Sequence, residues 1–335
     1  MFLDVDPTSK PRAAIALPVP PEVEATLRDA CLVDMAAGAD LATTLATAEG
    51  VLCSNQMPVD EAFFEAGPHL RVVSGFGVGY NNVDLEAANR RGILICNTPG
   101  VLNDAVADLT MGLILAFARR IPENNAFVHA RQWGVSSLPP FGFDLRGKTL
   151  GIIGFGRIGI AVAQRARPFG MQVIFHDVLD GARPGLEDCT YCSLQDVLVR
   201  SDIISIHTNL TPETYHLIST DELAMMKPSA VLVNTSRGPV VDQLALAHAL
   251  KAGQIAGAAL DVLEAEPPAI DDPLLGLPNV IALPHVGSAT HETRAAMLDL
   301  AVTNLIEALN GREPPACVNP EVLPLALNPR RHTGA

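Results

Sequence analysis

Short apolar, β-branched runs alternate with longer helical stretches along most of the chain, and this alternation limits the folds that the sequence can adopt. The first round of runs lies at 13–17, 50–55, 71–77 and 92–98. The second round lies at 149–156, 171–177, 202–208, 230–236, 257–262 and 279–285. Strands separated by helices pair in parallel and are covered by helices on both faces. The sequence therefore predicts an α/β protein with two separate doubly wound parallel sheets.

Length and charge narrow the class of protein further. A chain of 335 residues is longer than most single cores, which favours two domains. Its 23 Lys and Arg against 37 Asp and Glu give a net charge of -14 without any basic block, which argues against a nucleic-acid partner. The start of the chain has acids and prolines where a signal peptide needs a basic and then an apolar region, and no apolar run reaches the ~20 residues of a membrane span. We expect a cytoplasmic protein without a membrane partner.

Six cysteines are scattered through the chain, and a protein of this size does not need disulfides, so we expect free thiols. Cys189 and Cys192 in "CTYC" have the spacing of a zinc or redox knuckle. A tetrahedral zinc site needs further ligands, and the sequence has neither a second CxxC nor a nearby HxxxH. We predict no metal site, and a metal or redox role for this pair is the alternative.

A glycine motif opens the second round of runs. In "GIIGFGRIGIAVAQRARPFGMQVIFHD", Gly154, Gly156 and Gly159 have G-x-G-x-x-G spacing after an apolar strand and before a helix. The first glycine permits a tight turn, the second lets a pyrophosphate approach the helix N-terminus, and the third allows close packing of helix on strand. Asp177 ends the next strand, where an acid accepts hydrogen bonds from an adenosine ribose and repels a 2′-phosphate. The motif predicts a dinucleotide site with NAD preferred to NADP; the alternative is a glycine turn without a ligand.

Three ionisable residues follow later strands of the same predicted sheet: Arg237 after "AVLVNTS", Glu266 after "GAALDVLEA" and His285 in "VIALPH". The carboxyl ends of parallel strands share one edge, where such sheets bind ligands. An arginine suits a carboxylate, a histidine suits proton transfer near neutrality, and a carboxylate beside the histidine orients its ring. Glu264 remains an alternative to Glu266, and Arg237 could instead belong to a buried ion pair. We interpret the other histidines of helices and loops as surface groups: His69, His129, His216 and His248.

These motifs resemble a known family. In their order, "GIIGFGRIG" with Asp177, "VNTSRGPVVD", "ALDVLEAEP" and "LPHVGSAT" are similar to the D-isomer-specific 2-hydroxyacid dehydrogenases. "GVGYNNVDLEAANRRGILICNTPG" and "LTPETYHLI" most resemble the glyoxylate/hydroxypyruvate reductase branch. The resemblance implies that Arg237 orients the substrate, that Glu266 is the partner of His285, and that His285 is the acid/base.

The resemblance also implies the remaining contacts and the domain plan. Thr235 and Asp261 would hold the nicotinamide end of the cofactor, and the backbone amides of Val78 and Gly79 would bind the substrate carboxylate. Independently of the resemblance, we also expect cofactor contacts from Arg157, Ile158 and Gly287, and pocket walls from Leu52 and Phe76. We interpret His207 either as a structural hydrogen-bonding residue or as a cofactor contact on the adenine side. A flavodoxin-like substrate-binding domain of residues 1–101 and 286–335 would carry an inserted NAD-binding Rossmann domain of residues 102–285, with the cleft between them. Thr208 and Asn209, in "HTNLT", depart from the "HCPLT" that we expect in this family.

An apolar helix and a long segment rich in apolar residues connect the two rounds of strands. Residues 103–122 are apolar on more than one side, and the segment that follows contains the only tryptophan, Trp133. Such a segment is too long and too apolar for a solvated loop. We expect a homodimer that forms through residues 103–145.

Together these observations predict an NAD-dependent oxidoreductase that interconverts a small 2-keto acid, such as glyoxylate or hydroxypyruvate, and its D-2-hydroxy acid. A phosphite or 3-phosphoglycerate dehydrogenase of the same fold is the alternative enzyme. An NADH-sensing corepressor-like protein is the alternative of another class. A formate dehydrogenase is disfavoured, because that resemblance would place a glutamine, and not Glu266, opposite the histidine.

Overall fold

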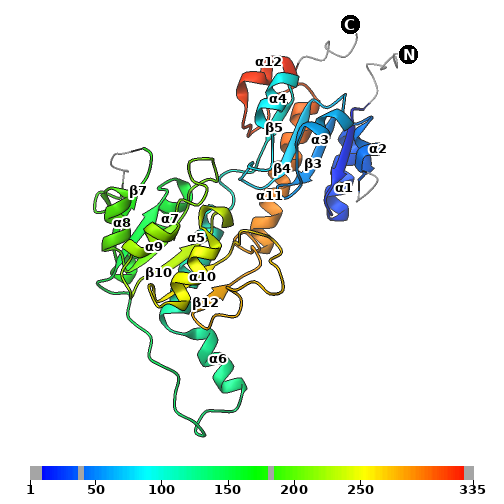
Figure 1. Ribbon diagram of the computed structural model, residues 1–335. Coiled ribbons are helices and arrows are strands. Elements are labelled where there is room, and N and C mark those ends of the chain that lie inside the picture. Colours follow the sequence, from blue (N-terminus) through cyan, green and yellow to red (C-terminus); the bar gives the residue numbers. More distant parts are fainter. Residues whose placement is uncertain (1–9, 37–40, 180–184, 328–335) are drawn as a thin grey trace. The chain divides into compact units, whose positions relative to one another are not determined.

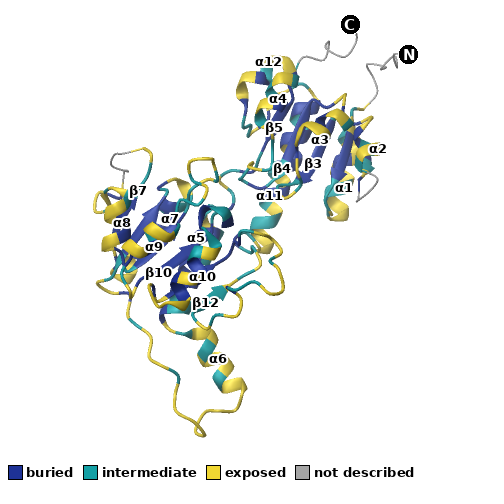
Figure 2. Cartoon of the chain, viewed as in Figure 1, coloured by how far each residue is buried: buried dark blue, intermediate teal, exposed yellow. Residues whose placement is uncertain are grey.

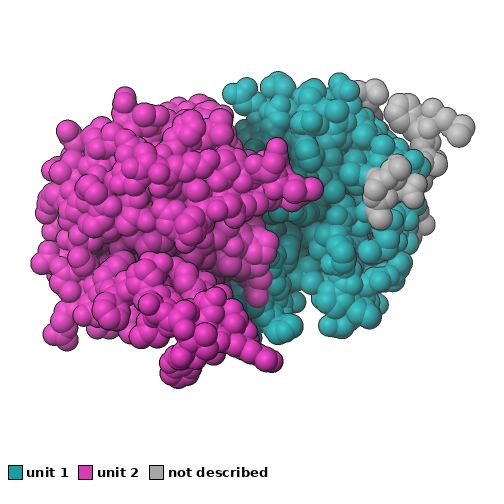
Figure 3. Space-filling model, turned by 60° about the horizontal axis from the view of Figure 1, so that its bottom comes forward, with its two compact units in different colours: residues 1–102, 290–335 teal, residues 103–289 magenta. Residues whose placement is uncertain are grey.

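The computed structural model describes residues 10–36, 41–179 and 185–327. The chain forms two compact units: one runs up to Leu102 and resumes at Thr290, and the other comprises Asn103–Ala289 (Figure 3). The inserted unit thus ends at Ala289, beyond the boundary that we expected after His285. The reason is that the amides of Val286 and Gly287 donate to the carboxylate of Asp261 in the same unit.

The first unit contains a parallel five-stranded sheet in the order β2-β1-β3-β4-β5 (Figure 1). One face packs against α1 and α11, and the other against α2, α3 and α4. The edge strand β2 is absent from the predicted runs because three of its four residues are exposed or polar. The elements are β1 (Arg12–Ala16), α1 (Pro21–Ala30), β2 (Leu32–Met35), α2 (Leu41–Leu45), β3 (Gly50–Ser54), α3 (Glu61–Ala66), β4 (Val72–Phe76), α4 (Leu85–Arg91), β5 (Leu94–Cys96), α11 (His291–Leu309) and α12 (Leu323–Ala326).

The second unit contains a parallel seven-stranded sheet in the order β12-β11-β10-β9-β6-β7-β8. Helices α8, α9 and α10 cover one face, and α5 and α7 cover the other. Buried apolar side chains fill both interfaces (Figure 2). The elements are α5 (Asn103–Ala118), α6 (Ile121–His129), β6 (Thr149–Ile153), α7 (Arg157–Ala166), β7 (Gln172–His176), β8 (Thr190–Tyr191), α8 (Leu194–Arg200), β9 (Ile203–Ile206), α9 (Thr220–Met225), β10 (Val231–Asn234), α10 (Gln243–Lys251), β11 (Gly257–Leu260) and β12 (Val280–Ala282).

The topology confirms the predicted fold class. From β6 the chain builds outward to β7 and β8, then returns to place β9 on the other side of β6. This reversal creates a crevice at the carboxyl ends of β6 and β9, which is where open α/β sheets bind ligands. The loops after β6, β7, β9, β10, β11 and β12 all leave from that edge, because the strands are parallel.

The segment that connects the two rounds of strands is largely buried in its first half and exposed in its second half. Helix α5 packs closely against α7 and buries seven side chains, as its apolar sequence predicts. Helix α5 ends at Ala118, Arg120 has left-handed backbone geometry, and α6 begins after it with no buried residue. Beyond α6, Trp133 is 73% exposed and Phe141 is 94% exposed. Within the described residues, no helix is both long and apolar enough to cross a membrane.

Candidate active site

The glycine loop follows β6 and opens α7. Gly154 has a φ of +90°, and a Cβ there would lie 2.7 Å from the backbone of His207, so the turn requires glycine. A Cβ at Gly159 would lie 2.3 Å from the carbonyl oxygen of Gly154, so helix and strand touch at this point. A Cβ at Gly156 would meet no atom of the described residues within 4 Å outside its own chain neighbours and helix backbone. Gly156 caps the N-terminus of α7 and is followed by exposed Arg157 and half-buried Ile158. The loop leaves open space for an anion at the helix N-terminus.

Asp177 ends β7 and faces the glycine loop. Its Oδ2 accepts the N–H of Phe155 at 2.5 Å, and its Oδ1 accepts the N–H of Leu179 at 2.9 Å. A carboxylate has about four acceptor positions, so two remain for a ligand. The structure therefore places this acid beside the loop, as the motif predicts.

His207 ends β9 on the other side of β6. Its Nε2 lies 2.8 Å from the hydroxyl of Ser205, while its buried Nδ1, like the hydroxyl of the adjacent Thr208, has no hydrogen-bond partner among the residues that the structure describes. Burial lowers the pKa of His207 to about 3, so its ring is neutral at physiological pH. Two unsatisfied polar atoms therefore lie beside the crevice between β6 and β9.

The three ionisable residues come together at the same edge. Nδ1 of His285 lies 2.7 Å from Oε2 of Glu266, and Oε1 of Glu266 accepts the N–H of Leu263 at 3.1 Å. Arg237 follows β10, donates to the carbonyl oxygen of Ser236 at 2.6 Å, and is close enough to interact electrostatically with Glu266. His285 has a φ of +55°, an uncommon conformation for a residue other than glycine.

In this cluster, Glu266 and Arg237 each stabilise the charged form of the other. Burial alone would raise the pKa of Glu266, but the hydrogen bond and charge of His285, the Leu263 amide and the charge of Arg237 outweigh it and lower that pKa. Burial lowers the pKa of Arg237, opposed by the charge of Glu266, although a guanidinium remains a cation. The cluster thus combines a lasting cation, an ionised carboxylate and an imidazole whose Nδ1 is held by that carboxylate.

Asp261 holds the loop that carries His285. Its carbonyl oxygen accepts the N–H of His285 at 2.9 Å, and its carboxylate accepts the N–H groups of Val286 at 2.8 Å and Gly287 at 2.7 Å. Burial raises the pKa of Asp261, although these two amides oppose the shift. Thr235 is also buried, and its hydroxyl lies 3.0 Å from that of Thr110 on α5. Both residues anticipated at the nicotinamide end lie at this edge.

In the first unit, the loop after β4 presents backbone donors. The carbonyl of Val78 accepts from Asn97 at 2.8 Å. Among the residues that the structure describes, the N–H groups of Val78 and Gly79 have no acceptor. Phe76 is half-buried, and the guanidinium of Arg294 lies 5.4 Å from its ring centre. This loop has the donors that a carboxylate needs.

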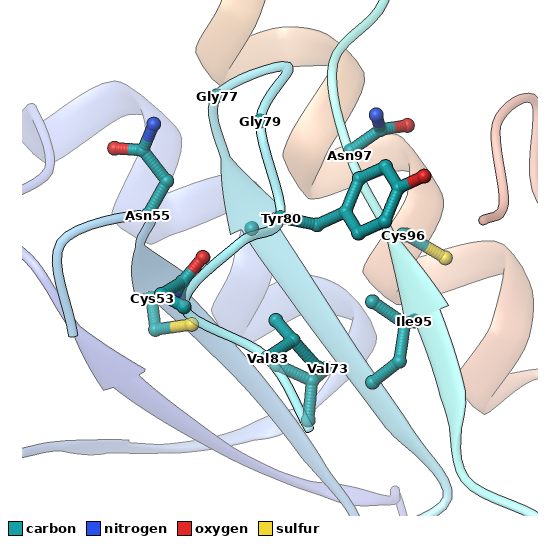
Figure 4. A pocket seen from close by; sticks show the side chains of 12 residues that line it. Cys53, Asn55, Val73, Gly77, Gly79, Tyr80, Val83, Ile95, Cys96 and Asn97 are labelled. Atoms are coloured by element: carbon teal, nitrogen blue, oxygen red, sulfur yellow. The ribbon is translucent and has the colours of Figure 1, made fainter. Parts of the chain in front are cut away.

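A small pocket opens beside that loop. Figure 4 shows Asn55, Tyr80 and Asn97 around the loop that carries Gly77 and Gly79. A Cβ at Gly77 would lie 2.5 Å from the Asn55 amide nitrogen, so this side chain packs directly on the loop. Leu52, by contrast, is fully buried in the core and has no surface for a substrate, so its expected role is corrected. Asn55 also lines this pocket, and in the sequence only its position two residues past a buried cysteine could have indicated this.

Glu264 has a partner of its own. Its Oε1 lies 3.0 Å from Nε2 of His216, while Glu266 contacts His285. Of the two candidate partners of His285, only Glu266 contacts it, and Glu264 pairs with a different histidine. The interpretation of His216 as a surface group is wrong, because its ring is mostly covered and paired. Its side chain could not be placed from sequence, since Glu264 lies 48 residues further along the chain.

The knuckle-like cysteines flank the short strand β8. Cys189 and Cys192 are free and partly buried, and burial raises the pKa of each thiol, that of Cys189 to about 11. Raised values disfavour the reactive thiolate. No group of three or more His, Cys, Asp or Glu side chains that could hold a metal occurs in the described part of the chain.

Comparison with known proteins agrees with this geometry. The family model for the NAD binding domain of D-isomer specific 2-hydroxyacid dehydrogenases matches residues 111–287. A glyoxylate reductase from Thermococcus litoralis is 49% identical over 79% of this chain and 82% of its own length. A glyoxylate/hydroxypyruvate reductase B from Serratia proteamaculans is 48% identical over 85% of this chain and 88% of its own length.

A solved structure is similar over most of its length. The NADPH-dependent glyoxylate/hydroxypyruvate reductase from Sinorhizobium meliloti, in complex with NADP and malonate, has a TM-score of 0.85 and 36% identity. The alignment covers 92% of this chain and 97% of that one. Fold, site and comparisons together define a dehydrogenase with a nicotinamide cofactor that reduces 2-keto acids. The chain belongs to the D-isomer-specific 2-hydroxyacid dehydrogenases.

Proposed function

We propose that this enzyme reduces glyoxylate or hydroxypyruvate to the corresponding 2-hydroxy acid with NADH, using His285 as the acid, Glu266 as its partner and Arg237 as the substrate-orienting cation. The observation that carries the proposal is the 2.7 Å contact between His285 and Glu266, with Arg237 within electrostatic reach. The names of the curated relatives support the choice of substrates.

The residues around the glycine loop fit a dinucleotide. A side chain at Gly154 or Gly159 would collide with backbone, and Gly156 leaves the α7 N-terminus open to a pyrophosphate. The unsatisfied atoms of His207 and Thr208 lie across the same crevice. When bound, the reduced nicotinamide supplies a hydride to C2 of the keto acid.

The chain's own residues supply the proton and the orientation. His285, as imidazolium, donates a proton to the carbonyl oxygen, and the negative charge of Glu266 favours this protonated form. Arg237 stabilises the negative charge that develops on that oxygen. The N–H groups of Val78 and Gly79, which have no acceptor among the described residues, would hold the substrate carboxylate. In the oxidative direction the same imidazole, when neutral, accepts the proton.

Asp177 favours NADH. Its carboxylate lies beside the glycine loop, where it would accept ribose hydroxyls and repel a 2′-phosphate. The Sinorhizobium reductase is NADPH-dependent, so members with a similar fold use the other cofactor. The acid at position 177 is the residue of this chain that supports NAD.

A homodimer through residues 103–145 is also part of the proposal. Trp133, Val135, Leu138 and Phe141 are each at least 65% exposed and follow one another on a single segment. A concentration of exposed apolar side chains marks an interaction surface. A second copy of the chain is the occupant that suits a segment placed directly after α5 and α6.

The direct test is steady-state oxidation of NADH with glyoxylate, hydroxypyruvate, pyruvate and longer 2-keto acids, and with NADPH in parallel. We expect the highest kcat/KM for glyoxylate or hydroxypyruvate with NADH. Reduction of NAD by phosphite or 3-phosphoglycerate, without turnover of any keto acid, would refute the proposed substrate. Faster turnover with NADPH would refute the cofactor assignment alone.

A further inference from the structure

A second histidine–carboxylate pair lies next to the proposed catalytic pair. Nε2 of His216 lies 3.0 Å from Oε1 of Glu264, and its Nδ1 lies 3.9 Å from Oδ2 of Asp242. The ring of Tyr215 stacks on His216 with 4.0 Å between ring centres. Glu264 and Glu266, which lie two residues apart, thus contact two different histidines. The proposed chemistry uses only the second pair.

The backbone around His216 is tied to the segment that follows Arg237. The N–H of His216 donates to Pro239 at 2.8 Å, and that of Ile218 donates to Val240 at 3.1 Å. The N–H of Asp242 donates back to Ile218 at 2.9 Å. Residues 216–218 therefore run beside residues 239–242, and the position of one segment fixes that of the other.

Glu264 is held from a second direction. Its N–H donates to the side-chain oxygen of Gln243 at 2.9 Å, and its Oε2 accepts the N–H of Gln243 at 3.3 Å. The side-chain amide of Gln243 donates to Asp272 at 2.5 Å. The segment that carries Glu264 and Glu266 is thus hydrogen-bonded to the start of α10. Through His216, it is also linked to the segment after Arg237.

The segment after Arg237 and the segment of residues 263–266 are in contact at Gly238. A Cβ at Gly238 would lie 1.8 Å from the carbonyl oxygen of Leu263, so the two backbones are in direct contact. The N–H of the same Leu263 donates to Glu266. His216 also has a φ of +52°, a conformation that persists only where surrounding contacts enforce it. A displacement of the 263–266 segment would therefore move Glu266 relative to Arg237.

We propose that His216 and Glu264 form a positioning clamp that holds Glu266 at its distance from His285 and Arg237. The proposal rests on the proposed roles of those three residues. Neither member of the clamp needs to contact the substrate. The titratable groups facing the His216 ring are Glu264, Asp242 and Tyr215.

The test compares His216→Leu and Glu264→Leu with His216→Gln, which keeps a side-chain donor, and with the exposed His248→Leu of α10 as control. For both clamp variants, we expect kcat to fall by roughly 10- to 100-fold, since small misplacements of catalytic groups have effects of this size. KM for the keto acid should stay at the wild-type value, because neither residue of the clamp contacts the substrate. NADH affinity, measured by fluorescence titration, should stay at the wild-type value, and His216→Gln should recover most of kcat.

A double variant, His216→Leu with Glu264→Leu, should be no slower than either single variant, because the two residues act as one unit. The clamp is refuted if the leucine variants keep the wild-type kcat, or if His216→Gln is as slow as His216→Leu. If the leucine variants do not fold, His216→Ser and Glu264→Ser, whose side chains are too short to meet, are judged on the same readouts against the control. A wild-type enzyme without keto acid turnover refutes the proposed function itself, which separates the two failures.

Discussion

One carboxylate joins His285 to a neighbouring loop: Oε2 of Glu266 lies 2.7 Å from the imidazole Nδ1, and Oε1 accepts the Leu263 N–H at 3.1 Å. The loop that carries His285 is itself held by Asp261 through three hydrogen bonds. The imidazole is thus oriented from both its side chain and its backbone. Its Nε2 has no hydrogen-bond partner in the described part of the chain.

His285→Gln tests the proton donor. We expect kcat for glyoxylate or hydroxypyruvate to fall by roughly 10² to 10⁴, the usual contribution of general acid catalysis, with NADH affinity retained. Stopped-flow or steady-state rates give the first quantity and fluorescence titration the second. His248→Gln, an exposed substitution in α10, should match the wild type. A His285→Gln enzyme with near-normal kcat would remove this residue from the mechanism.

Glu266→Gln tests the influence of the carboxylate on pH dependence. Because its pKa lies below the ordinary glutamate value, wild-type Glu266 stays ionised, and continues to favour imidazolium, to a pH below that value. Its contribution to folding stability is complete above the ordinary value and is lost as pH falls through the lowered one. Urea denaturation at several acidic pH values should therefore show a shallower loss of stability with falling pH in Glu266→Gln than in wild type. The exposed Glu86→Gln should keep the wild-type slope, and a wild-type slope in Glu266→Gln would contradict the pairing.

Asp177→Asn tests cofactor choice with the loop contact preserved, since an amide oxygen can still accept the Phe155 N–H. Removing the charge should lower KM for NADPH and raise KM for NADH. The ratio of kcat/KM values should shift by about tenfold or more, equivalent to about 1.4 kcal/mol. Asp221→Asn, on the exposed side of α9, is the matched control. An unchanged ratio would mean that another residue sets the preference.

His207 predicts a pH dependence of stability. In the unfolded chain this histidine takes up a proton near its ordinary pKa of 6.5, whereas in the folded protein it does so only near 3. Stability from the neutral ring is therefore complete above pH 6.5 and is lost as pH falls toward 3, by about 1.4 kcal/mol per pH unit. Urea denaturation at several pH values should show a shallower slope for His207→Gln than for wild type. The slope of His248→Gln should equal that of wild type; equal slopes for all three proteins would contradict the burial argument.

The exposed apolar segment predicts the assembly state. Phe141→Arg combined with Val135→Arg should convert a dimer to a monomer, because the charges cannot be buried at an apolar interface. Light scattering measures the mass directly. Ile270→Arg, at an equally exposed apolar position, should leave the mass unchanged. A monomeric wild-type protein would refute the proposed dimer.

The sequence alone determined the fold class and the ends of the strands on which the site is built. Buried parallel strands require apolar β-branched runs, and a turn at positive φ requires glycine, so both leave local signals. For the same reason Gly154, Arg237 and His285 could be assigned to one edge of one sheet. The short strands β2 and β8 had no such signal, because they are brief and partly exposed.

Only the tertiary structure decided which side chains meet. Glu264 and Glu266 are two residues apart, yet they face His216 and His285, because the turn between them points their side chains in different directions. Leu52 and Asn55 lie close together in sequence, but the first is in the core and the second packs on the loop after β4. Such pairings depend on contacts between segments far apart in the chain. Local sequence patterns record whether a residue is buried or turned, not which distant group it will touch.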